Sequence, residues 1–82
     1  MSAEVESKLK EIMASLLTIE PALIDDQTSI ETVELWDSLN HMNLMAGIEE
    51  TFKVTLSTEE IIEGTSYEAI CRVLKRHGVD IL

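Results

Sequence analysis

The chain has 82 residues, which is enough for one small domain with one hydrophobic core. It contains 16 acidic residues against 6 lysines and arginines, and the formal net charge is -10. This balance argues against direct binding to nucleic acid or to an anionic membrane, because both need clustered cations. An acidic surface favours basic patches on protein partners.

The single cysteine, Cys71, excludes an internal disulfide, so nothing indicates an oxidising compartment. No apolar run is long enough to span a membrane. The acidic first residues lack the basic and apolar segments of a secretory signal. We therefore expect one domain over residues 1–82, located in the cytoplasm, and a monomer, since nothing in the sequence requires an oligomer.

A first amphipathic helix is predicted over residues 3 to about 17, because apolar residues recur on one face. Glu6 and Lys10 stand four residues apart, an order that adds about 0.2–0.5 kcal/mol. Pro21 is expected to end this helix. The apolar face comprises Val5, Leu9, Ile12, Met13 and Leu16.

A long connection follows over residues 18–36. Connections of this length are unusual in a compact domain unless they pack as structured loops or serve function. Apolar residues are scattered through it, so we expect it to lie over the helices as a lid. These residues are Ile19, Leu23, Ile24, Ile30 and Val33.

Asp37 is the predicted N-cap of a second helix that runs to about Lys53. At about 100° per residue the two sides of this helix differ. The side expected to face the core holds His41, Leu44, Met45, Ile48 and Phe52. The other side mixes apolar and polar residues: Leu39, Met42, Asn43, Ala46, Glu49, Glu50 and Lys53.

Ser57 and Glu60 have the spacing of a capping box and predict a short third helix, which Gly64 ends. Thr65 and Glu68 repeat that spacing before a last helix. The last helix has an apolar face of Tyr67, Ile70, Cys71 and Leu74. Basic residues lie in or near its last turns, where positive charge suits the helix dipole: Arg72, Lys75, Arg76 and His77. Gly78 is expected just after its end. No stretch predicts a strand. The expected fold is therefore all-α: a four-helix bundle of three longer helices and one short helix, with a long loop between helices 1 and 2.

Motifs for a metal, a nucleotide or catalysis are absent from the sequence. Cys71 lies on an apolar face, which predicts a buried and unreactive thiol. Ser38 and His41 are three residues apart and could be proposed as a nucleophile pair. The helical projection turns His41 toward the bundle, however, so we interpret it as a histidine at the edge of the core.

Ser38 follows the predicted N-cap, at the first turn of a helix and after a long loop. Its hydroxyl is expected to be exposed among helix N-terminal amides, where an attached phosphate is favoured. Position alone leaves open a second reading, in which Ser38 is an ordinary polar residue of the first turn.

The motif Trp36-Asp37-Ser38-Leu39, followed by Leu44, Ile48-Glu49-Glu50 and Phe52, resembles the acyl carrier proteins. The resemblance covers nearly the whole chain, including the order of the helices. It implies that Ser38 carries covalent 4′-phosphopantetheine, whose thiol holds acyl or aminoacyl groups as thioesters. It also implies that the chain is a carrier and not an enzyme, with no catalytic residues and no metal.

The resemblance further implies three kinds of partner: a phosphopantetheinyl transferase, an acyl-loading ligase or acyltransferase, and downstream biosynthetic enzymes. Asp37 and Leu39 would help the transferase to recognise Ser38. The outward side of the second helix is predicted to dock on basic partner surfaces, the alternative being that its apolar members are ordinary surface residues. The predicted recognition residues are Asp37, Leu39, Met42, Ala46, Glu49 and Glu50.

Three positions depart from the pattern of carriers in fatty-acid synthesis. Asn40 and Asn43 stand where acidic residues are common, and Trp36 stands where a small residue is usual. This predicts a dedicated carrier of a specialised pathway, such as polyketide, nonribosomal peptide, modified amino-acid or surface-polysaccharide synthesis. A housekeeping fatty-acid carrier, a peptidyl or aminoacyl carrier and an unmodified acidic interaction module remain as alternatives.

Carriers of long chains in this family can shelter their cargo between the helices. We expect a core that is nearly closed without cargo, because so small a domain can leave few apolar side chains unburied. The residues that could line such a space are Ile48, Phe52, Ile61, Ile62, Tyr67 and Cys71.

Overall fold

The computed structural model describes residues 3–79. Within this range the chain forms four α-helices and one 3₁₀ turn, η1. No strand occurs in the described range, where Ser29 and Ser66 form an isolated β-bridge. These elements confirm the predicted all-α fold of three longer helices and a short one. Their bounds are α1 Ala3–Leu17, η1 Pro21–Leu23, α2 Ser38–Phe52, α3 Thr58–Glu63 and α4 Tyr67–Arg76.

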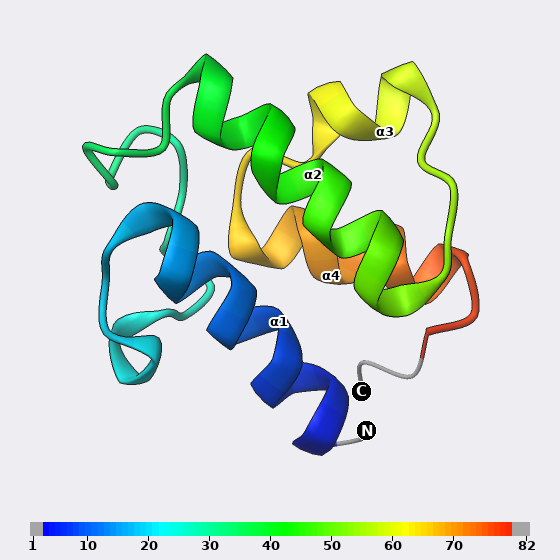
Figure 1. Cartoon of the computed structure of the whole chain (residues 1–82), viewed down its shortest axis with the longest axis horizontal. Coiled ribbons are helices and arrows are strands. Elements are labelled where there is room, and N and C mark those ends of the chain that lie inside the picture. The colour runs from blue at the N-terminus through cyan, green and yellow to red at the C-terminus, as the bar shows by residue number, and fades with distance from the viewer. Residues whose placement is uncertain (1–2, 80–82) are drawn as a thin grey trace.

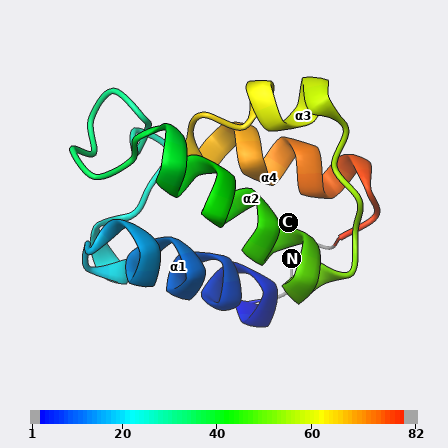
Figure 2. The same ribbon diagram turned by 45° about the horizontal axis from the view of Figure 1, so that its top comes forward.

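Helix α2 occupies the centre of the molecule. Figures 1 and 2 show it passing between α1 on one side and α3 on the other, with α4 behind it. Helix α1 packs against α2, and α3 packs against α4. No helix in residues 3–79 is both long and apolar enough to cross a membrane.

Helix α1 has the predicted bounds, and its core face is largely as expected. Leu9 and Met13 are completely buried, and Lys10 pairs with Glu6 at 3.0 Å. Helix α1 ends at Leu17 as its predicted bounds required, but Pro21 does not end it: the chain leaves the helix at Thr18, which takes a left-handed φ of 55°. Pro21 instead begins η1, a position that suits its fixed φ and missing N–H.

The predicted core face of α2 is confirmed. His41, Leu44, Met45 and Ile48 are buried, and Phe52 is half-buried. Asp37 caps the helix as predicted. Lys53 ends the helix in a left-handed conformation with a φ of 57°.

The first predicted capping box is confirmed, since Ser57 and Glu60 exchange both of its hydrogen bonds at 3.1 Å. The second predicted capping box, formed by Thr65 and Glu68, is wrong. Ser66 caps α4 by accepting from the Ala69 amide at 3.0 Å, and Glu68 pairs with Arg72 instead. The register differs because Ser66 has the extended conformation of an N-cap and is held there by its bridge to Ser29.

The connection between α1 and α2 packs on the helices, as the lid prediction required. Ile24 and Trp36 are each 2% exposed. Backbone hydrogen bonds fasten the loop to the start of α4, from Ile30 to Thr65 and from Tyr67 to Thr28, both at 2.9 Å. Ile19, Ile30 and Val33 pack on the core, whereas Leu23 is 71% exposed and does not.

The core is nearly closed, as expected. A cavity between α2, α3 and α4 has a volume of about 10 Å³, room for about one water molecule. Of the six residues named as possible lining for cargo, only Ile48 borders it. The cavity is lined by Met45, Ile48, Leu56, Glu60, Gly64, Ile70, Val73 and Leu74.

Candidate functional site

The candidate site is the junction where the long loop enters α2. Asp37 has extended backbone, and its carboxylate accepts a hydrogen bond from the Asn40 amide at 2.9 Å. Ser38 is the first residue of the helix and is exposed, as predicted. The amides of Ser38 and Leu39 precede the first intrahelical hydrogen bond, which runs from the His41 amide to the Asp37 carbonyl at 2.8 Å. These amides and the helix dipole favour an anionic group on the Ser38 hydroxyl.

Asn40 has a structural role at this junction that sequence reasoning missed. Its side-chain amide donates to the Leu35 carbonyl at 2.8 Å and so ties the loop to the first turn of α2. An ionised aspartate or glutamate at this position could not donate this bond. Asn40, which stands where related carriers often have an acidic residue, therefore ties the loop to the helix.

His41 is buried, 8% exposed, and both of its ring nitrogens have partners. The indole Nε1 of Trp36 donates to Nδ1 at 3.0 Å, and Nε2 lies 2.7 Å from the Ile61 carbonyl oxygen. The rings of Trp36 and His41 stack, with centroids 6.2 Å apart. Because neither nitrogen is left for the Ser38 hydroxyl, His41 cannot serve it as a base in this arrangement.

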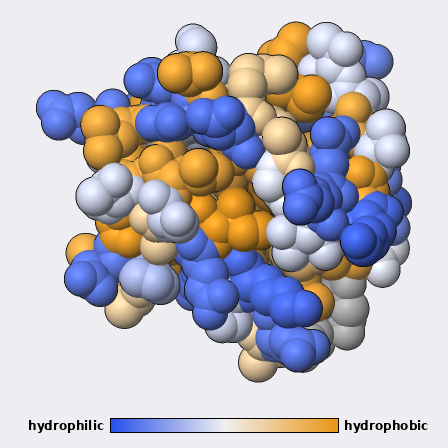
Figure 3. All heavy atoms as spheres, viewed as in Figure 1, coloured by the Kyte–Doolittle hydropathy of each residue, from blue (hydrophilic) through white to orange (hydrophobic). Residues whose placement is uncertain are grey.

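The outward side of α2 is open to solvent around Ser38. Leu39 is 72% exposed and Met42 53% exposed, and Ala46 and Glu50 are also exposed. Glu49 differs, since it is half-buried and its carboxylate accepts from the Leu56 amide at 2.8 Å. Figure 3 shows hydrophobic residues gathered near the middle of this face among hydrophilic ones.

Two further exposed apolar residues were not among the predicted recognition residues. Leu35, in the loop just before the site, is 45% exposed, and Ile62 on α3 is 69% exposed. Ile62 was considered only as a possible lining for cargo, and its exposure shows that this assignment was wrong. The sequence could have indicated this exposure, because Ile62 lies in a helix of six residues of which the other members, apart from Ile61, are Thr or Glu.

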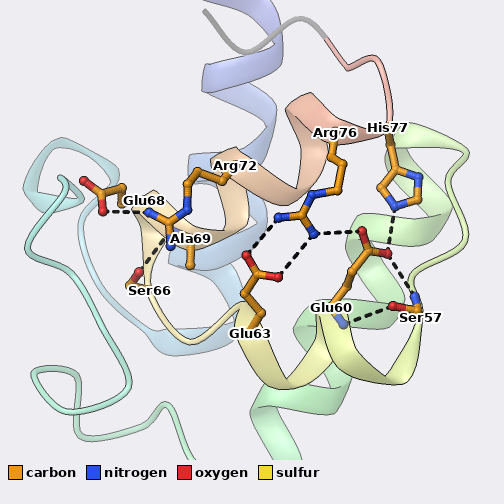
Figure 4. A network of polar contacts seen from close by, with 9 residues as sticks. All are labelled: Ser57, Glu60, Glu63, Ser66, Glu68, Ala69, Arg72, Arg76 and His77. Atoms are coloured by element: carbon orange, nitrogen blue, oxygen red, sulfur yellow. Dashed lines mark hydrogen bonds and ion pairs between the residues drawn. The ribbon is translucent and has the colours of Figure 1, made fainter.

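A charged network between α3 and α4 is structural. Figure 4 shows Arg76 reaching from α4 to Glu60 and Glu63 of α3, with His77 beside Glu60. Hydrogen bonds from His77 and from the Ser57 amide lower the pKa of Glu60 to about 2. His77 is the exposed C-cap of α4, and its ring lies 2.8 Å from Glu60.

Cys71 is half-buried, and burial raises the pKa of its thiol. The thiolate is therefore disfavoured, which agrees with the prediction of an unreactive cysteine. Within residues 3–79, no three His, Cys, Asp or Glu side chains gather in a way that could hold a metal ion.

Comparison with known proteins identifies the family to which this chain belongs. Residues 7–74 match the family described as the phosphopantetheine attachment site. The match covers most of the chain, so the chain belongs to this family. Its members carry covalently attached 4′-phosphopantetheine and are carriers rather than catalysts. The chain accordingly has an acyl carrier role, as the resemblance implied.

Similar proteins include three polyketide synthases. Non-reducing polyketide synthase pigA of Monascus ruber is 32% identical over 72 residues, which cover 88% of this chain. Citrinin polyketide synthase of Monascus purpureus is 26% identical over 80 residues, or 96% of the chain, and non-reducing polyketide synthase AC of Didymella fabae is 28% identical over 72 residues, or 88%. The chain spans only 3% of the length of each relative. No solved structure matches the chain significantly.

Proposed function

We propose that Ser38 is the attachment residue for 4′-phosphopantetheine and that the chain carries acyl intermediates as thioesters. The observation that supports this best is the exposed position of Ser38 at the start of α2, directly after the Asp37 cap. The residues present fit the group, because a phosphodiester on this hydroxyl would lie at the first-turn amides, where an anion is favoured. The attached group supplies a terminal thiol that holds the acyl chain.

Loading requires a separate transferase with coenzyme A as donor. The Ser38 oxygen forms a new bond to the phosphorus next to pantetheine, and the phosphoanhydride bond of coenzyme A breaks. Adenosine 3′,5′-bisphosphate leaves, and a base on the transferase takes the hydroxyl proton. The chain contributes the nucleophilic oxygen and the backbone of its helix start, with Asp37 holding the first turn in place.

We propose that the surface formed by Leu39, Met42, Ala46 and Glu50 docks the partner enzymes. These residues are exposed, lie on one side of α2 and begin directly after Ser38. No lysine or arginine occurs between Lys10 and Lys53. The segment that includes this surface therefore has Asp and Glu but no Lys or Arg side chains. Acidic charge would steer a basic partner, and the apolar contacts would supply more of the affinity. Glu49 stays a predicted recognition residue, with its bond to Leu56 as a second role.

The partners that this role needs are a phosphopantetheinyl transferase, an acyl-loading ligase or acyltransferase, and the enzymes that process the bound intermediate. We propose a specialised biosynthetic pathway in the cytoplasm, of polyketide type. The names of the similar proteins support a polyketide pathway. Asn40 and Asn43 in place of acidic residues support a partner set different from that of a fatty-acid synthase.

Modification of Ser38 is tested by intact mass after incubation with coenzyme A and a broad-specificity transferase. The wild type should gain the mass of one phosphopantetheinyl group, and Ser38→Ala should gain nothing. Ser15→Ala is the matched control, because Ser15 is also exposed but lies on α1. This variant should be modified like the wild type. An unmodified wild type would indicate a plain interaction module, and ester turnover by the unmodified chain that depends on His41 would indicate a hydrolase.

The docking surface is tested by the KM of the same transferase for the carrier. Leu39→Asp should raise this KM about tenfold, which corresponds to a loss of about 1.4 kcal/mol in binding. Leu23→Asp is the matched control, because Leu23 is as exposed as Leu39, 71% against 72%, but lies on η1. Equal KM values for the two variants would contradict the proposed surface.

A further inference from the structure

His41 joins three segments that are separate in the sequence. It belongs to α2, it receives a hydrogen bond from Trp36 at the end of the long loop, and its other nitrogen lies at the Ile61 carbonyl of α3. Trp36 is almost completely buried, and His41 is nearly so. A chain of two hydrogen bonds, the first buried and the second partly buried, therefore runs from Trp36, two positions before Ser38, to α3.

The partners of His41 determine where its proton lies. An indole N–H can only donate, so Nδ1 of His41 must be the unprotonated acceptor. A backbone carbonyl can only accept, so Nε2 must carry the proton and donate to Ile61. Ile61 lies in the last turn of α3, where carbonyls lack intrahelical donors. The neutral ring with its proton on Nε2 satisfies both partners at once.

From this geometry we infer that His41 is a positioning residue for Ser38. Asp37 fixes only the local start of α2, through its bond to Asn40. The loop that leads into that start is tied to α2 by the Asn40 side chain at Leu35 and, from within the core, by the bond from Trp36 to His41. The bond from His41 to Ile61 holds the same imidazole against α3. The direction in which Ser38 is presented therefore depends on a buried ring whose hydrogen-bond partners are Trp36 and Ile61. This inference rests on the proposed role of Ser38 as the attachment residue.

The two bonds can be removed separately. The side-chain oxygen of asparagine takes nearly the place of Nδ1, so His41→Asn can keep the bond from Trp36 and lose the bond to Ile61. The side-chain nitrogen of glutamine takes nearly the place of Nε2, so His41→Gln keeps the bond to Ile61 and loses the acceptor for Trp36. His41→Leu loses both, and Trp36→Phe removes the donor while leaving an aromatic ring in the core.

The first measurement is the rate of phosphopantetheinylation, at a temperature where circular dichroism shows every variant fully folded. His41→Gln, His41→Leu and Trp36→Phe should lower kcat about tenfold with KM within twofold, whereas His41→Asn should keep most of the wild-type kcat. Leu44→Val, which disturbs the buried side of the same helix without removing either bond, should leave kcat unchanged. A wild-type kcat for His41→Leu would overturn the inference.

The second measurement does not depend on modification. Nitrogen NMR of the wild-type imidazole should show a protonated Nε2 and an unprotonated Nδ1, and the indole proton of Trp36, the only tryptophan, should exchange slowly. In His41→Leu the amide of Asn40, which bonds to Asp37, should exchange about tenfold faster. If the wild type proves not to be modified, the role of Ser38 fails, and this exchange alone decides whether His41 fixes the junction. Unchanged exchange would refute positioning by His41.

Discussion

Gly64 occupies the corner between α3 and α4, where a side chain has almost no room. It is buried, and its φ of −77° and ψ of 53° lie in a region open to other residues. A Cβ atom there would lie 3.3 Å from the Glu60 carbonyl oxygen, 3.4 Å from Cγ1 of Ile70 and 3.6 Å from Cε of Met45. The glycine is therefore required by close packing and not by its backbone angles.

Two opposing effects decide the outcome of Gly64→Ala. Alanine restricts the unfolded chain and so stabilises by about 0.4–1 kcal/mol where the backbone is compatible. Against this, an added methyl in a packed core costs about 1–3 kcal/mol. The Glu60 carbonyl cannot easily move, because it accepts the Gly64 amide at 3.0 Å, and the neighbouring cavity offers only about 10 Å³. We expect the unfolding free energy to fall by about 1 kcal/mol, and Tm by about 4–8 °C.

Gly47→Ala is the matched control, with the opposite sign expected. Gly47 lies inside α2, and a Cβ atom there would meet only Cγ2 of Ile12, at 3.4 Å. This distance is an ordinary contact with the end of a side chain. Since alanine is better than glycine in a helix interior by about 0.8–1 kcal/mol, the variant should be more stable than the wild type.

Urea denaturation followed by far-ultraviolet circular dichroism measures both variants. If the unfolding free energy falls with urea concentration at the same slope in both variants and the wild type, the shift in urea midpoint reports the change in unfolding free energy. The two alanines should move the midpoint in opposite directions. A Gly64→Ala variant at least as stable as the wild type would refute the reasoning, because the Glu60 carbonyl would then not limit the space at this corner.

Further predictions concern the cap and the charged network. Asp37→Ala should lower the unfolding free energy by about 1 kcal/mol, because the Asn40 amide loses its acceptor. Asparagine is an equally good cap, so Asp37→Asn should leave the unfolding free energy nearly unchanged. Equal urea midpoints for the two variants would contradict this prediction. The pKa of Glu60 is lowered from 4.5 to about 2, so its contribution to stability is complete above pH 4.5 and is lost as the pH falls toward 2. Urea midpoints measured across this range should fall less steeply for Glu60→Gln than for the wild type, and identical slopes would show that Glu60 is not responsible.

The sequence by itself determined the number of helices, most of their ends and the inward face of α2. These features are local, since they depend on the helical period and on bonds between a side chain and a backbone amide three residues away. The Ser57 box and the Asp37 cap are of this kind, and so is the exposed place of Ser38. Even locally one cap was predicted wrongly: the capping box was expected at Thr65, whereas Ser66, which bridges to Ser29, caps α4.

Only the tertiary structure decided the partners of the polar side chains. Asn40 and Glu49 bond to backbone groups across loops, and Arg76 crosses from α4 to α3. The helical periodicity of α2 was enough to place His41 toward the core. It could not predict the hydrogen bonds of His41 to Trp36 and Ile61, since Ile61 is 20 residues away along the chain. A period fixes the direction of a side chain on its own helix, whereas the group it meets depends on how the other segments pack around that helix.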